Sequence, residues 1–234
     1  MAAITYKIKY IKLFRGIFKT IWFNFHYLPF KQAMKLPILL YKPHIIASKG
    51  TIVIKGEIRP FMIKLGIPQV FIYPKTGVMF ENWGGEIIFE GSCKVGNASA
   101  ISVGEKGVLH INDDFRATCS LKLACYHHID IGRNVLAGWD CMIVDSDFHV
   151  MTKTDGGTTR GYAPIQIGDN VWMAMKCVVL KGSVIPNNTV LSACTLFSTK
   201  KQFNEKSVIS SSLEPFVKIE GMYRNVNNDN ITYK

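Results

Sequence analysis

A histidine follows two closely spaced aspartates at the point where the most regular part of the sequence ends. The segment reads Asp145-Ser146-Asp147-Phe148-His149, and a polar stretch begins directly after it. Histidine side chains are largely neutral near pH 7, so an imidazole at such a place can accept a proton. That function needs a group on the other ring nitrogen to fix the tautomer, and both Asp147 and Asp145 could supply it. These residue types allow proton transfer at this junction, and the alternative is a loop histidine beside solvated carboxylates.

The region around this junction, from Ile129 to Lys200, repeats an apolar residue every six positions. The repeated positions are Ile131, Ala137 and Ile143 before the polar stretch, and Ile167, Met173, Val179, Ile185, Leu191 and Phe197 after it. A period of six matches neither the 3.6 residues of a helical turn nor the alternation of a simple strand. It indicates a coil of short strands in which each apolar residue points inward and stacks on its counterparts in the next turn.

Two blocks of this repeat carry a resemblance to a known family. They read Ile131-Gly132-Arg133-Asn134-Val135 and Ile167-Gly168-Asp169-Asn170-Val171-Trp172, and Val179-Leu180-Lys181-Gly182 and Ser198-Thr199-Lys200 follow them. With these motifs the chain resembles the hexapeptide-repeat acyltransferases, from about Ile88 to Lys200. The resemblance implies a mainly β fold, a left-handed parallel β-helix, which assembles as a homotrimer and takes its acyl group from acetyl-CoA.

The resemblance also implies functions for particular residues. A histidine at the position of His149 is the general base in this family, and Asp147 or Asp145 would orient it. The positions that would contact acetyl-CoA are Trp172, Ala174, Ser192, Ala193 and, at its phosphates, Lys200 and Lys201. The chain departs from the family where Met173-Ala174-Met175-Lys176 replaces the usual Ile-Gly-Ala-Asn, and where Ser192-Ala193-Cys194-Thr195 replaces Gly-Ala-Gly-Ser. We expect these added side chains to narrow the donor groove.

Two stretches of the sequence bear on which molecule accepts the acyl group. The sequence from Asn24 to Phe30 and the junction at His149 are similar to those of acyltransferases that act in bacterial surface polysaccharide assembly. This similarity implies transfer to a sugar, with a hydroxyl acceptor favoured over an amino group. The composition of the polar stretch predicts an external loop at residues 150–164. Loops on a rigid scaffold often carry sites. We expect Asp155, Arg160 and Tyr162 in this loop to contact the sugar.

The charge of the chain is concentrated at its N-terminal end. The formal net charge is +11, yet no Asp or Glu occurs before Glu57. Residues 4–25 alternate apolar and basic side chains at helical spacing, which predicts an amphipathic helix in peripheral contact with a membrane. The alternative is a helix that packs on a neighbouring subunit or on the end of the coil. No recognised nucleic-acid motif accompanies this charge, so we expect no nucleic-acid partner.

These patterns divide the chain into three segments. We expect a basic helical segment and connector at 1–48, the β-helix with its loop at 49–200, and a short C-terminal extension at 201–234. The apolar runs are too short to span a membrane, and no cleavable signal peptide is evident. The expected location is therefore the cytoplasm, at the inner face of the membrane if the N-terminal helix binds there.

Two other functions compete with acyl transfer. His127 and His128, together with His149, suggest a zinc site like that of the γ-type carbonic anhydrases, although adjacent residues on a strand face opposite sides. A trimeric scaffold without catalysis is the second alternative. The six cysteines form no C-x-x-C pair and mostly occupy repeat positions, so we expect buried, reduced thiols and no bound metal.

Overall fold

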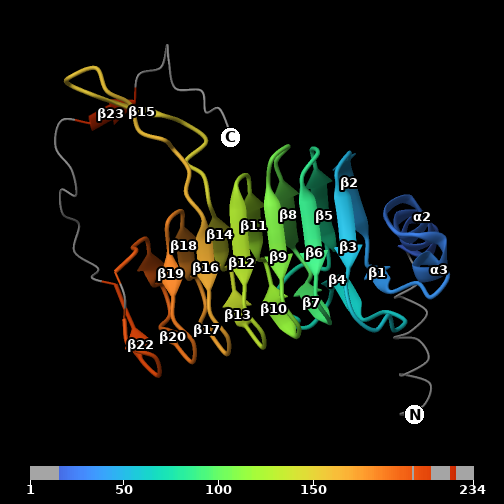
Figure 1. Cartoon of the computed structure of the whole chain (residues 1–234). Helices are drawn as coiled ribbons and strands as arrows, with labels where there is room; N and C mark the ends of the chain where they lie inside the picture. The colour runs from blue at the N-terminus through green and yellow to red at the C-terminus, as the bar shows by residue number, and fades with distance from the viewer. Residues whose placement is uncertain (1–15, 202, 212–221, 225–234) are drawn as a thin grey trace.

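The chain winds as a parallel β-helix in the computed structural model, which describes residues 16–201, 203–211 and 222–224. Successive strands pass in turn to three parallel sheets that run along one axis (Figure 1). The parallel sheets confirm, in outline, the coil of short strands that the repeat predicted. Residues 4–15 of the expected N-terminal helix lie outside the described residues.

Each sheet joins strands that are far apart in sequence but occupy the same side of successive coils. The first sheet contains, in spatial order, β1 (Ile38–Leu40), β4 (Ile63–Ile67), β7 (Cys93–Gly96), β10 (Phe115–Cys119), β13 (Leu136–Trp139), β17 (Trp172–Met173), β20 (Val190–Leu191) and β22 (Val208–Ile209). The second contains β2 (Pro43–Ser48), β5 (Val78–Asn82), β8 (Ser99–Val103), β11 (Lys122–Cys125), β14 (Met142–Val144), β18 (Val178–Leu180) and β21 (Leu196–Phe197). The third contains β3 (Thr51–Ile54), β6 (Glu86–Phe89), β9 (Val108–Ile111), β12 (His128–Ile131), β16 (Ile165–Ile167) and β19 (Val184–Ile185). Strands of the coil therefore occur on both sides of the expected range 49–200.

The length of each coil explains why the repeat is clear only late in the chain. Met173 pairs with Leu191 and Leu191 with Ile209, and each step equals three repeats of six. Earlier, Val95 pairs with Ala117 and Ala117 with Ala137, and both of these steps are longer than three repeats. The additional residues of the early coils lengthen their strands and corners, and the period of six is lost there.

The repeated residues form the core of the coil. All nine apolar repeat positions between Ile131 and Phe197 are at most 3% exposed. Five of the six cysteines are buried as expected, but Cys194 is exposed because it lies at a corner of the coil in the left-handed backbone region. All six are free thiols.

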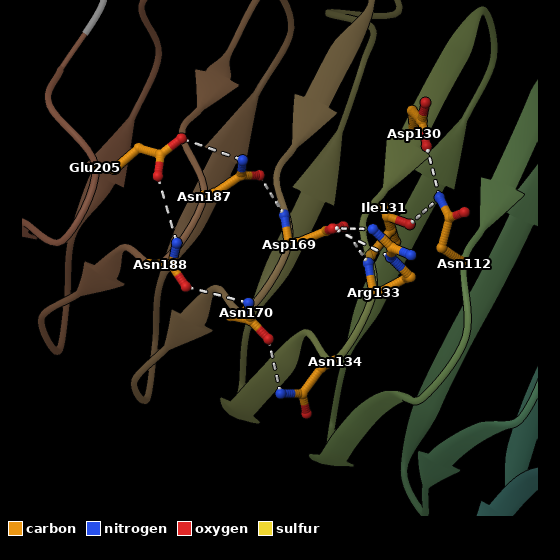
Figure 2. A network of polar contacts seen from close by, with 10 residues as sticks. All are labelled: Asn112, Asp130, Ile131, Arg133, Asn134, Asp169, Asn170, Asn187, Asn188 and Glu205. Carbon is orange, nitrogen blue, oxygen red and sulfur yellow. Dashed lines mark hydrogen bonds and ion pairs between the residues drawn. The ribbon is translucent and has the colours of Figure 1, made fainter.

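One corner of the coil is marked by a column of asparagines. Asn134, Asn170 and Asn188 have φ angles between 54° and 57°, a left-handed conformation that Asn adopts more readily than most residues. Asn134 Nδ2 donates to Asn170 Oδ1 at 2.9 Å, and Asn170 Nδ2 donates to Asn188 Oδ1 at 3.1 Å (Figure 2). Beside this column, Arg133 Nη2 donates to Asp169 Oδ2 at 2.9 Å. The side chains thus connect coils where the backbone turns.

Two helices cover the N-terminal end of the coil. They are α2 (Ile17–Tyr27) and α3 (Phe30–Ala33), and α2 lies against β1, the edge strand of the first sheet (Figure 1). Asn24 Oδ1 accepts a hydrogen bond from the Ile38 N–H at 3.0 Å, and Asn24 Nδ2 donates to the Ile38 carbonyl at 2.7 Å. Thr20 Oγ1 accepts from the Leu40 N–H at 3.0 Å. Side chains of a helix therefore take the place of a further strand and cover an edge that would otherwise be open.

The external loop interrupts the coil without changing its register. Ile129 pairs with Ile165 across the loop, a step of six repeats, which is twice the step of the later coils. Within the loop, β15 (Met151–Lys153) pairs antiparallel with β23 (Met222–Arg224), far along the chain (Figure 1). Among the described residues, no helix is long and apolar enough to cross a membrane.

Replacing Asn24 by Ala is expected to lower the free energy of unfolding by about 2–4 kcal/mol, because the N–H and C=O of Ile38 would both lose their partners inside the protein. Denaturant unfolding followed by circular dichroism measures the change. The exposed Asn204 is a matched control, and Asn204→Ala should change stability by less than about 0.5 kcal/mol. Equal effects of the two substitutions would contradict the proposed cover of the edge strand.

Candidate functional site

The external loop leaves the β-helix at the corner between the second and third sheets. It starts after β14 in the second sheet and ends before β16 in the third. At the same corner, the preceding coil contributes the turn of residues 126–127 and the following coil contributes Lys181. We call the loop residues 145–149 and 160–162, together with these neighbours, the loop base.

Asp145 is buried at the loop base and holds the preceding turn. Its Oδ1 accepts a hydrogen bond from the Tyr126 N–H, and its Oδ2 accepts one from the His127 N–H, both at 2.8 Å. Burial raises the pKa of the Asp145 carboxyl, and the two backbone donors act in the opposite direction. Both oxygens therefore have a structural function that the sequence did not predict.

Asp147 connects the loop to the following coil. Its carboxylate pairs with Lys181 Nζ at 2.8 Å, and its N–H donates to the Gly161 carbonyl at 2.7 Å. His149 lies two residues further on and is exposed. The structure thus places His149 at the start of the loop, exposed and two residues after an anchored aspartate.

His127 lies in the turn that the preceding coil contributes to the loop base. Its ring centroid lies 4.8 Å from that of Tyr162, and the guanidinium of Arg160 lies 4.3 Å from the centre of the Tyr162 ring. Burial lowers the pKa of His127, and the nearby charge of Arg160 lowers it further. Tyr162 is 4% exposed and packs inside the loop base, whereas Arg160 is exposed. Of these two predicted sugar contacts, Arg160 is therefore the accessible one.

Asp155 lies at the tip of the loop. Thr152 and Thr158 form a bridge below it, and Asp155 Oδ1 accepts a hydrogen bond from the Gly157 N–H at 2.8 Å. This is the local bond with which Asp stabilises a turn. The structure therefore gives Asp155 a function in the hairpin tip and separates it from the loop base.

The residues predicted to contact acetyl-CoA fall at two corners of the coil. Trp172 is 50% exposed in the first sheet, and Ala174, Ser192 and Ala193 lie in the turns that follow β17 and β20. Lys200 and Lys201 are exposed after β21, at the corner from which the loop also leaves. The width of the second sheet lies between these two groups.

The departures from the family pattern lie close to Trp172. Met175 is 45% exposed, and Lys176 is exposed in the turn that leads from the first sheet to the second. Lys176 and Cys194 both have left-handed φ angles, 57° and 62°, one coil apart. Their side chains therefore project at the edge where the donor groove was expected.

Sequence reasoning missed the contributions of neighbouring coils. It indicated Lys181 only as part of a motif, and His127 only as a possible zinc ligand. Counting whole coils from Asp145 would have brought the turn at 126–127 and Lys181 to the same corner, because a coil equals three repeats of six or slightly more. Within the described part of the chain, no three His, Cys, Asp or Glu side chains are grouped as a metal site.

Asp145→Ala is expected to lower the free energy of unfolding by about 2 kcal/mol or more, because it removes the acceptors of two backbone N–H groups. Asp147→Ala removes a partly exposed ion pair and should cost less than about 1 kcal/mol. Thermal and denaturant unfolding of the two variants provide the comparison. If Asp147→Ala proved the more destabilising, the structural function assigned to Asp145 would be wrong.

Comparison with known proteins gives no further support for a family. No family model, no curated protein and no solved structure matches this chain. The sequence motifs and the geometry of the loop base therefore carry the functional proposal.

Proposed function

We propose that the protein is an acyltransferase of the hexapeptide-repeat type, with a left-handed coil and a trimeric assembly. It moves an acetyl group from acetyl-CoA to a hydroxyl group of a sugar in bacterial surface polysaccharide biosynthesis, with an amino group as the less favoured acceptor. The observation that carries this proposal is the exposed His149 at the start of a loop that projects from one corner of a parallel β-helix.

In this proposal His149 acts as the general base. Its neutral imidazole accepts the proton of the acceptor hydroxyl as the oxygen attacks the acetyl carbonyl. The carbon–sulfur bond of the thioester breaks, and the thiolate of CoA leaves and takes up a proton. The acetyl group goes directly to the acceptor, so the buried cysteines need no function. General-base catalysis contributes roughly 10²- to 10⁴-fold, and the remainder comes from holding the two substrates together.

The loop base supplies the surroundings that a catalytic histidine needs. The pair of Asp147 and Lys181 ties the start of the loop to the next coil, so His149 is carried by an anchored segment. Arg160 is an exposed residue of the loop base, and its guanidinium can bind an acidic group of the acceptor. A sugar joined to a nucleotide or lipid phosphate has such a group.

The predicted donor residues fit acetyl-CoA in chemistry. Trp172 offers an exposed aromatic surface, Ala174 and Ser192 are small and partly exposed, and Lys200 and Lys201 offer ammonium groups for phosphates. The donor supplies an activated acetyl thioester. The two groups of residues lie at different corners of the coil. A groove that uses both groups therefore crosses the second sheet or forms between two subunits. The second arrangement favours the homotrimer. We place the enzyme in the cytoplasm, where the donor is made.

Isothermal titration with acetyl-CoA, combined with an assay of CoA release in the presence of candidate sugars, tests this function. Wild type and His149→Ala are both expected to bind the donor, and transfer should fall by roughly 10²- to 10⁴-fold in the variant. His44 is exposed in β2, away from the loop, and His44→Ala serves as the control with unchanged transfer. Absence of donor binding, or full activity of His149→Ala, would overturn the proposal.

A further inference from the structure

The helix α2 presents a fixed apolar face to solvent. Thr20 and Asn24 are fully buried against β1, so the opposite side of the helix must point outward. Phe18 is 85% exposed, Trp22 45% and Phe25 43%. The face continues over Phe30 and Met34 at 70% and 61% exposure. We call these five residues the aromatic face.

A hollow of about 530 Å³ lies beside the aromatic face. It is lined by Lys19, Trp22, Ile45, Ile46, Ala47, Ser48, Lys49 and Trp83. These lining residues include two lysines and no Asp or Glu. Lys19 Nζ donates to the Pro43 carbonyl at 3.1 Å, and Lys49 Nζ lies 5.3 Å from the centre of the Trp83 ring. An ammonium group has three donors, so each lysine can also bind an anion.

The chemistry of this end of the protein is complementary to an anionic lipid surface. No Asp or Glu precedes Glu57 in the sequence, and none lines the hollow; Glu81, which pairs with Ala47 from the neighbouring strand, accepts a hydrogen bond from Ser102. Phe and Trp side chains beside Lys are typical of segments that lie in the membrane interface. A nucleic acid or an acidic protein would match the lysines but would leave the aromatic face in water. The combination therefore favours a bilayer.

We propose that this end of the coil docks on a membrane that contains anionic lipids. The hollow takes a lipid phosphate between Lys19 and Lys49, while Phe18, Trp22 and Phe25 enter the interface. Because α2 is fastened to β1, the docking surface is preformed, and binding does not require the helix to fold. This inference goes beyond acyl transfer and does not depend on it.

Sedimentation with vesicles tests the proposal on the full-length protein. Vesicles of equimolar phosphatidylglycerol and phosphatidylcholine are expected to bind it, and vesicles of phosphatidylcholine alone should bind it much more weakly. Each lysine near an anionic surface contributes about fivefold to binding, so Lys19→Glu/Lys49→Glu should weaken binding about 25-fold or more. Lys49→Glu alone, at an exposed position, should weaken it about fivefold or more and covers the case in which the double variant does not fold.

Matched controls separate this surface from general charge and general hydrophobicity. Lys122→Glu/Lys206→Glu makes the same charge change at exposed positions elsewhere, and Phe71→Ser removes a side chain that is 92% exposed elsewhere. Both controls should bind vesicles like wild type, whereas Phe18→Ser/Phe25→Ser should lose most binding. Soluble glycerol phosphate should not displace the protein, because a headgroup without a bilayer leaves the aromatic face in water.

Three results would overturn the proposal. The first is that wild type fails to sediment with anionic vesicles, and the second is that the lysine variants bind like their control. The third is that Phe18→Ser/Phe25→Ser changes the oligomeric state in analytical ultracentrifugation but not vesicle binding, which would identify the aromatic face as an interface between copies. Because the assay contains no acetyl donor and also works with His149→Ala, its outcome is independent of the proposed catalysis.

Discussion

The hydrogen bonding of a parallel coil runs along a single axis, and the rest of the structure depends on this constraint. Each strand needs a neighbour before and after it, so the first coil has an edge with nothing to pair it. Here Thr20 and Asn24 of α2 bond the backbone of β1 in place of a strand. Thr20 and Asn24 therefore turn inward together with Phe23, while Phe18, Trp22 and Phe25 face outward. A helix with buried polar residues and an exposed aromatic face is the result of covering a polar edge.

The sequence predicted the core of the late coils well, and the reason is geometric. When a coil consists of three repeats of six, each side has the same length and the inward residue recurs at a constant interval, as from Met173 to Leu191. The early coils vary in length, as the longer step between Val95 and Ala117 shows, and no fixed period can mark their inward positions. The first strands, from Ile38 onward, lie in the range that was expected to be connector, because Pro37 and Pro43 beside them are also typical of a chain break.

The sequence predicted the parts of the candidate site that are local in the chain, but not the contacts between neighbouring coils. The sequence identified the junction at His149 and the loop that follows it, since both are local features. It did not show that the Asp145 carboxylate accepts hydrogen bonds from the N–H groups of residues 126–127, or that Asp147 pairs with Lys181. Those contacts join neighbouring coils, so no local pattern of the sequence marks them. The division of the predicted donor residues between two corners arises in the same way.

The pairing of β15 with β23 sets an order in which the parts of the molecule can be completed. A coil needs only the coil before it, so the β-helix can grow from its N-terminal end as the chain is synthesised. The strand that pairs with the loop comes from residues 222–224, later in the chain than every strand of the three parallel sheets. The scaffold is thus able to form before the loop acquires its partner. A nascent chain with all its coils in place would still lack the pairing of β15 with β23 in the loop that follows His149.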